Sequence, residues 1–175
     1  QFGFLVGSYA VGLFLPQILK EGQLSDIEVG FVSSACYVVA SIAMIGWATH
    51  VDRRGGRVVN LTFSCLLAAV GFIGAILSSG FWMSMVWLTV ALSGINAARG
   101  LFWTIPPRFL TGIAAAGGLA FINSIGTMGG FVGPIVMGWL TERTGSFLAG
   151  LAAMAGFLLL AGGLAWSLKL FVKQD

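Results

Sequence analysis

The chain has 175 residues, of which 58% are hydrophobic and only 9% are charged, and its net charge is +3. About a quarter of the residues of a soluble domain are charged. So few charges could not cover a surface in water, and the composition favours a protein of the lipid bilayer. The basic residues are scattered over the connections between apolar stretches, so we expect no nucleic-acid partner.

Six apolar stretches are long enough to cross a bilayer, which takes about 20 residues of helix. In chain order we predict spans at about 2–19, 27–50, 59–79, 81–107, 112–140 and 147–170. The sequence therefore predicts an all-α membrane protein, with one transmembrane bundle over residues 1–175. The two cysteines lie inside apolar stretches, where we expect them to pack in the core rather than to form a disulfide or bind a metal.

Local signals mark the ends of these helices. Ser25 and Glu28 form a capping-box pattern before the second span, in which each side chain bonds the backbone amide of the other. The stretches LSSGFW and RTGSF are Gly/Ser turns that end one helix and begin the next. The two prolines of TIPPRFLTG predict that the fourth helix ends near them.

Each of the first two spans holds one tyrosine. Tyr9 lies close to Gly12 in the first span, and Tyr37 shares a helix face with Ser33 and Ser41 in the second. A tyrosine within a span either lines a polar cavity or packs with its hydroxyl satisfied. The residues alone leave both interpretations open.

The connection after the second span, THVDRRGGR at 49–57, holds four charged side chains in an otherwise apolar region. Gly55 and Gly56 would let the chain turn tightly there. His50 is the only histidine, and a lone histidine beside arginines in a loop is not expected to relay protons.

The fourth span has the most polar face. Ser93, Asn96 and Arg99 recur at spacings of three, and Trp103 follows four residues later, which places them on one side of the helix. A charge within a span is costly and suggests function, and the planar guanidinium of Arg99 could bind a carboxylate. We therefore predict Asn96 and Arg99 as substrate contacts, with the alternative that Arg99 snorkels outward.

The distribution of basic residues predicts the orientation. One side of the membrane receives six of them: Arg53, Arg54, Arg57, Arg108, Lys169 and Lys173. The other side receives Lys20 and Arg143. By the positive-inside rule the first side is cytoplasmic, so we expect both ends of the chain in the cytoplasm.

A similarity between two short segments suggests an internal repeat. GWATHVDRRGG follows the second span and GWLTERTGS follows the fifth. Since three spans separate them, they must lie on opposite membrane faces, as in an inverted 3+3 repeat.

The charged loop resembles the signature loop of the major facilitator superfamily, roughly Gly-x-x-x-Asp-Arg-x-Gly-x-Arg. Four residues fill its positions: Asp52, Arg53, Gly55 and Arg57. The leading glycine is replaced by Ala48, and Gly56 stands where a polar or basic residue is common. The segments FWTIP and INSIGTMGGFVGP are similar to the last three helices of the anion:cation symporter family, which includes bacterial permeases for tartrate, phthalate and sugar acids.

The resemblance covers nearly the whole chain and implies the C-terminal half of a twelve-helix carrier. This half would itself be a 3+3 inverted repeat, and the N-terminal half of the carrier is missing here. It implies a secondary active symporter of small organic anions such as tartrate, phthalate or sugar acids, which works by alternating access with a coupling proton or sodium ion. The expected location is the bacterial cytoplasmic (inner) membrane. The expected partners are the bilayer, a small carboxylate and the missing half, with no cofactor and no metal.

The resemblance also implies roles for residues. Tyr9 and Tyr37 match positions that line the central cavity, and Trp103 forms part of its wall. Asn123, with Ser124 beside it, matches a position directed at the polar substrate; the alternative for Asn123 is a hydrogen bond between helices. The family usually has no arginine at the position of Arg99.

In the superfamily the loop acid, here Asp52, holds the closed inner gate against the N-terminus of a helix in the opposite half, braced by arginines. The alternative is a positive-inside anchor, which needs the arginines but neither Asp52 nor the glycines. A proton-coupling carboxylate and the family's anion-binding arginine would lie in the missing half, because every acid of this chain is at a helix end or in a loop.

Two other classes of protein were considered. A membrane enzyme such as an intramembrane protease needs a nucleophile–base pair or a metal set. Gly-x-Ser-x-Gly does not occur and no histidine lies within a span, so we expect no enzyme. A six-helix membrane protein without transport activity, such as a non-transporting subunit or scaffold, stays open as the alternative.

Overall fold

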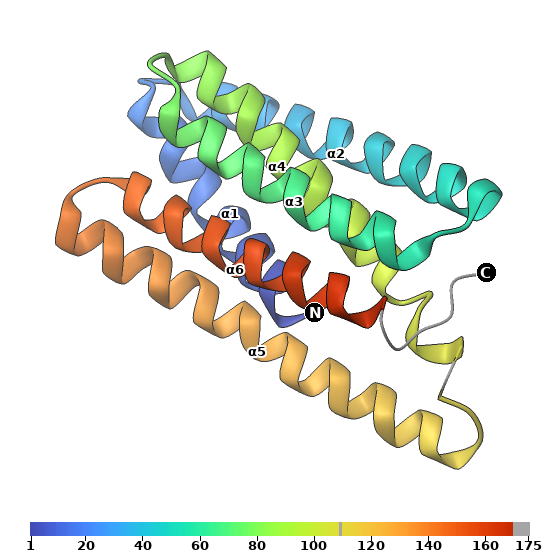
Figure 1. The fold of residues 1–175 in the computed structure, drawn as a ribbon. Coiled ribbons are helices and arrows are strands. Elements are labelled where there is room, and N and C mark those ends of the chain that lie inside the picture. Colours follow the sequence, from blue (N-terminus) through green and yellow to red (C-terminus); the bar gives the residue numbers. More distant parts are fainter. Residues whose placement is uncertain (109, 170–175) are drawn as a thin grey trace.

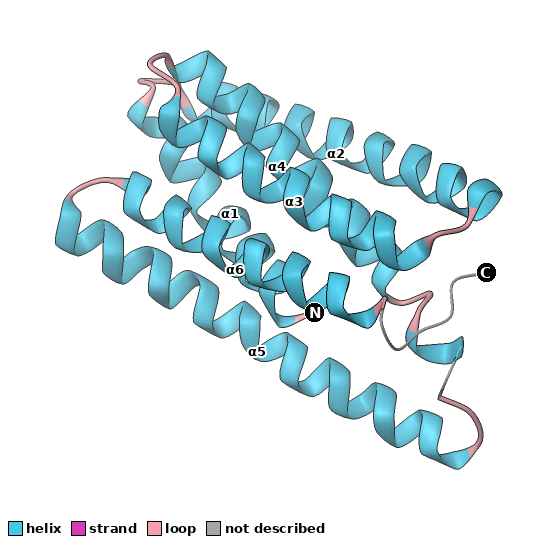
Figure 2. Ribbon diagram, in the orientation of Figure 1, coloured by secondary structure: helices cyan, strands magenta, loops and turns pink. Residues whose placement is uncertain are grey.

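The computed structural model of the chain describes residues 1–108 and 110–169. Within them it contains six long α-helices, one short 3-10 helix and no strand (Figure 2). The elements are α1 (Phe2–Glu21), α2 (Asp26–Arg54), α3 (Arg57–Leu77), α4 (Phe81–Phe102), η1 (Pro106–Arg108), α5 (Ile113–Thr144) and α6 (Phe147–Leu168). All six α-helices have the length and apolar composition of a membrane span, which confirms the all-α membrane fold predicted from the sequence.

The helices run antiparallel to one another along the chain (Figure 1). The α1–α2, α3–α4 and α5–α6 connections lie at one end of the bundle, and the α2–α3 and α4–α5 connections lie at the other. The C-terminal ends of α2 and α5 therefore lie at opposite ends of the bundle (Figure 1). This is the arrangement predicted from the similarity between GWATHVDRRGG and GWLTERTGS.

The two three-helix sets interlock. Helix α1 of the first set packs mainly against α5 and α6, whereas α4 of the second set packs mainly against α2 and α3. Helices α3 and α6 also pack against each other. Exchange of the two sets relates these pairings to one another, as an inverted repeat with a pseudo-two-fold axis predicts. The match is incomplete, because α5 also packs against α6 whereas α2 hardly touches α3.

Helices α2 and α5 form the two least buried flanks of the bundle. Only 17% of the apolar window of each is buried, compared with 50% in α1 and in α3. Large side chains such as Phe31 on α2 and Phe131 on α5 are exposed. These apolar flanks must face lipid or another protein surface, because exposed apolar area of this extent is not stable in water.

Small residues bring the helix backbones close together. Gly94 of α4 lies against the backbone of Ser64 and Ala68 of α3, and Gly133 of α5 lies against the backbone of Val6 of α1. Close contacts of this kind let transmembrane helices associate by van der Waals packing where the hydrophobic effect is weak. They hold α1 and α4 in the middle of the bundle, where the polar residues described below are found.

Local capping explains the helix ends. The capping box of Ser25 and Glu28 is present: Ser25 Oγ accepts from Glu28 N at 3.4 Å, and Glu28 Oε2 accepts from Ser25 N at 2.8 Å. Between α2 and α3, Gly55 and Gly56 have φ of +73° and +70°, values that favour glycine. The prediction that these glycines permit a tight turn is confirmed.

Two helices continue past the predicted spans, whereas the end of the fourth span agrees with the prediction. We predicted a second span over 27–50, but α2 continues to Arg54. The fourth membrane span covers Phe81–Arg108, close to the predicted 81–107, and α4 itself ends at Phe102, before the two prolines, as predicted. We predicted that the fifth span ends at 140, but α5 continues to Thr144. It stops there because Gly145, with φ of +68°, caps it in the left-handed conformation.

Candidate functional site

Residues from α1, α2 and α4 meet around Arg99, the charged residue of α4. Its Nη2 donates a hydrogen bond to Ser8 Oγ of α1 at 2.6 Å. Gly12 lies one helical turn after Ser8, on the same face of α1. Tyr37 approaches α1 at Gly12, where a Cβ would lie 3.5 Å from the Tyr37 hydroxyl oxygen. We call Ser8, Tyr37 and Arg99 the polar cluster.

The polar cluster brings together two predicted site residues and one that sequence analysis missed. Tyr37 and Arg99 were predicted separately, from different helices. Ser8 gave no signal, because a serine next to Tyr9 in an apolar helix is ordinary; only the arrangement of α1 beside α4 places its hydroxyl on the guanidinium. Arg99 points inward to α1 in this arrangement rather than outward along its own helix.

Tyr9 faces a different neighbour from Ser8. Its ring packs against Gly130 of α5, where a Cβ would lie 3.0 Å from two ring carbons, and the residue is 47% exposed. Successive residues of a helix point in different directions, so Ser8 meets α4 while Tyr9 meets α5. Tyr9 therefore lies at the surface of the bundle, where α1 packs against α5.

Asn96 and Trp103 extend the face of α4 that carries Arg99. Asn96 is half-buried one turn before Arg99. Trp103 is the C-cap residue of α4, is partly exposed, and packs edge-to-face on Phe102 with ring centroids 5.5 Å apart. Asn96, Arg99 and Trp103 thus recur at helical spacing along α4 and its C-cap.

Asn123 and Ser124 lie apart from the polar cluster. Both are exposed on α5, and Asn123 Oδ1 accepts a hydrogen bond from Gln1 Nε2 at 3.4 Å, beside the start of α1. The backbone carbonyls of Asn123 and Ser124 both accept from Thr127 Oγ1, at 2.8 and 3.0 Å. Gln1 is about two helical turns from Ser8 along α1, so any ligand touching both Asn123 and Arg99 must span that distance.

The contacts of the predicted gating loop are made within the loop and with the first turn of α3. Asp52 Oδ1 forms a salt bridge with Arg57 Nη2 at 3.1 Å, while Arg53 is exposed. Asn60, which sequence analysis missed, donates through Nδ2 to the carbonyls of Gly55 and Gly56 at 3.3 and 3.0 Å. An amide one turn into the helix after a glycine pair was the available signal, since it can reach back to the turn.

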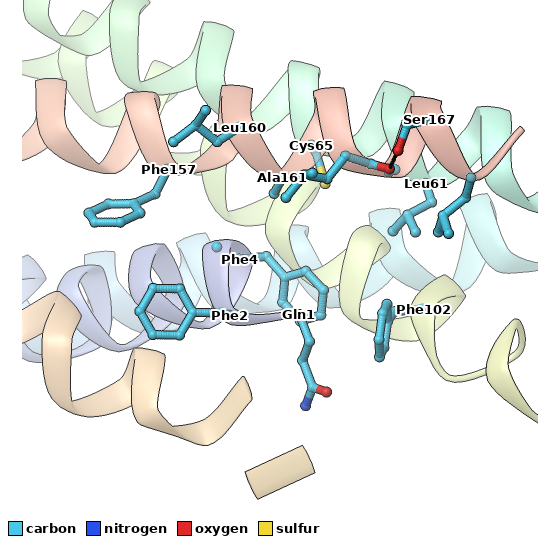
Figure 3. Close-up of a pocket in the computed structure, with 14 residues that line it drawn as sticks. Gln1, Phe2, Phe4, Leu61, Cys65, Phe102, Phe157, Leu160, Ala161 and Ser167 are labelled. Atoms are coloured by element: carbon cyan, nitrogen blue, oxygen red, sulfur yellow. Dashed lines mark hydrogen bonds between the residues drawn. The ribbon is translucent and has the colours of Figure 1, made fainter. Parts of the chain in front are cut away.

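A separate apolar cavity of about 490 Å³ lies between α1, α3, α4 and α6. Figure 3 shows Phe2, Phe4, Phe102 and Phe157 around it, and Cys65 and Leu61 of α3 also line it. The predicted substrate residues are absent from its lining. Its walls offer few polar groups to an anion, so we place the candidate site at the polar cluster instead.

Known proteins resemble the chain closely. It is 44% identical over 160 residues to a protein of Agrobacterium vitis named "Putative tartrate transporter", covering 91% of this chain and 36% of that protein. A second A. vitis protein of the same name is 42% identical over 160 residues, covering 91% and 37%. A protein of Acinetobacter baumannii named "Quinolone resistance transporter" is 41% identical over 145 residues, covering 82% and 33%. No family model and no solved structure matches the chain.

The chain spans a little over a third of the length of the two A. vitis relatives. The similarity covers 91% of this chain. The signature loop, the six membrane helices and these relatives agree. Most of the chain is therefore similar to part of three proteins named as transporters, and its charged loop resembles the signature loop of the major facilitator superfamily.

Proposed function

We propose that the chain is the C-terminal six-helix half of a secondary active transporter that carries small organic anions by alternating access. The observation that carries this proposal is the 44% identity to a protein named for tartrate transport. The polar cluster supports it, because cationic side chains within membrane spans are costly and rare, and those that occur usually mark substrate or ion pathways.

The exposed flanks of α2 and α5 support a second half. A matching six-helix bundle would cover these apolar flanks and would enclose the polar cluster between the halves. Secondary transporters of this kind bind substrate at such an interface and rock the two halves around it. A membrane protein without transport activity would need the apolar flanks covered too, but it would have no use for the buried charge of Arg99.

The position of Asp52 supports a role in a gate. It lies in the last turn of α2, where the helix dipole disfavours a carboxylate, whereas the N-terminus of another helix would stabilise it by about 0.3–1 kcal/mol. Its present partner, Arg57, belongs to the same loop. We propose that Asp52 exchanges Arg57 for a helix N-terminus of the other half when the inner gate closes.

The gate is tested with Asp52→Asn in the full-length transporter. The matched control is Asp26→Asn, which removes an exposed ion pair with Lys20 at the opposite end of the same helix. We expect Asp52→Asn to increase cytoplasmic accessibility of a cysteine introduced near the gate and to slow transport, and Asp26→Asn to do neither. Unchanged accessibility and rate in Asp52→Asn would leave the plain positive-inside anchor as the function of this loop.

Transport itself is tested by uptake of radiolabelled tartrate into cells that express the full-length gene. We expect uptake that ends when an ionophore dissipates the proton or sodium gradient, and the ionophore used then identifies the coupling ion. A full-length protein that moves neither tartrate nor other small carboxylates would refute the organic-anion proposal.

The relative named for quinolone resistance favours a second candidate, export of an aromatic zwitterion. Reduced cell-associated quinolone on expression, without carboxylate uptake, would support it. We propose the bacterial cytoplasmic membrane as the location, with both ends of this chain in the cytoplasm. Labelling of single cysteines in the α2–α3 and α1–α2 connections from each side of the membrane tests this orientation.

A further inference from the structure

Arg99 carries a charge that the described part of the chain does not neutralise. It lies inside the membrane span that extends from Phe81 to Arg108 and is half-buried. The ion pairs within residues 1–108 and 110–169 are Lys20–Asp26 and Asp52–Arg57, both at helix ends. A cation within a membrane span is costly when no counter-charge lies beside it, so an anion from outside this bundle would be stabilised next to Arg99.

The hydrogen bonds of Arg99 show where that anion would bind. A guanidinium has five N–H donors in a planar fork, and the bond from Nη2 to Ser8 Oγ uses one of them. Nε is buried and has no hydrogen-bond partner. Since the Ser8 hydroxyl is neutral, it fixes the plane of the guanidinium without neutralising its charge.

We propose that Ser8 positions Arg99 as the group that binds a carboxylate of the substrate, so that this half of the transporter selects for negative charge by itself. This inference rests on the proposed function. A carboxylate accepts two parallel N–H bonds from an arginine, and it would supply both the missing partner for Nε and the missing negative charge. Ser8 acts as a positioning residue, because it holds the guanidinium and leaves the remaining donors free.

The proposal predicts different effects for different substitutions. Arg99→Gln removes the charge, so we expect KM for tartrate to rise by at least about tenfold. Arg99→Lys keeps the charge but loses the fork, so we expect an intermediate KM. Ser8→Ala frees the guanidinium to move, so we expect KM to rise by about threefold or more with little change in maximal rate. Ser8→Thr keeps the hydroxyl and should restore most of the affinity.

Charge selectivity separates this role from a structural one. Tartrate and its neutral diamide have nearly the same shape, so their relative potency as competitors of uptake measures recognition of charge. The wild type should prefer the dianion strongly, and Arg99→Gln should lose most of that preference. Two matched controls should change nothing. Arg143→Gln removes a charge stacked on Trp139 at the far end of α5, and Ser167→Ala removes a hydroxyl on α6 that bonds only its own helix.

Binding is measured separately from transport through the rise in Tm of the purified full-length protein with tartrate. Stabilisation of the wild type that Arg99→Gln abolishes would support the inference even if uptake of tartrate fails, in which case the proposed transport alone is wrong. If Arg99→Gln lowers affinity for the dianion and the diamide equally, or leaves both unchanged, the inference is overturned. It is also overturned if no small carboxylate stabilises the wild type.

Discussion

Gly94→Ala tests the close contact between α3 and α4 on which the position of Arg99 depends. A Cβ on Gly94 would lie 2.6 Å from Ala68 N, 2.7 Å from Ser64 O and 2.9 Å from Ala68 Cα. All three are backbone atoms, so no change of side-chain rotamer can relieve the clash. The added methyl group must therefore push α3 and α4 apart along an otherwise buried interface.

The cost follows from overpacking. Inserting a methyl group into a well-packed core costs about 1–3 kcal/mol, and separated helices also lose dispersion contacts along their length. For a protein of this size we expect Tm to fall by about 2 °C or more. The measurement is thermal unfolding of the purified protein in detergent, followed by thiol labelling of Cys65 and peptide mass analysis. Cys65 of α3 is only 1% exposed, so it reacts once this part of the bundle opens.

Gly163→Ala is the matched control, because a Cβ at Gly163 of α6 would have no atom within 4 Å. Alanine is a better helix former than glycine by about 0.5–1 kcal/mol, so the control should unfold at the wild-type temperature or slightly above it. If Gly94→Ala has the same Tm as Gly163→Ala, the backbones of α3 and α4 are not in close contact. Our account of how α4 is held would then be refuted.

Two further predictions concern helix ends. Ser25→Ala should destabilise the first turn of α2 by about 0.5–2 kcal/mol, seen as faster hydrogen exchange of the Glu28 amide, whereas Ser25→Thr should retain protection; equal exchange in both variants would contradict the capping box. Gly56→Ala places a side chain at φ of +70° and should lower Tm through a penalty of about 1 kcal/mol, whereas Gly46→Ala, with open space around its Cβ, should not. A Tm for Gly56→Ala at or above that of Gly46→Ala would argue against the left-handed turn.

The number and type of the helices could be predicted from the sequence because the information is local. Each span needs an unbroken apolar stretch, and its ends are set by residues within one turn, as with Ser25 and Glu28 or with Gly55 and Gly56. The prediction was least accurate at the C-terminal ends of α2 and α5. There the helices continue past the predicted spans to Arg54 and Thr144, and a glycine follows each.

The candidate site could be predicted only in part. Helical spacing placed Asn96 and Arg99 on one face, and the family resemblance pointed to Tyr37. Neither could show that the partner of Arg99 is Ser8, because the two residues are 91 positions apart in the chain. The resemblance implied that arginines of the loop brace Asp52. That Arg57 pairs with Asp52 depends on the geometry of the glycine turn, which the sequence does not show.

The sequence by itself determined that this is a six-helix membrane bundle, because the length and hydrophobicity of each span are properties of single segments. Its signature loop and glycine-rich fifth span also indicated the resemblance to the major facilitator superfamily. Only the tertiary structure decided which helices touch, since α1 packs with α5 and α6 and α4 with α2 and α3. This packing brings the Ser8 hydroxyl of α1 to the Arg99 guanidinium of α4. Such a contact between two helices cannot be inferred from the sequence of either helix alone.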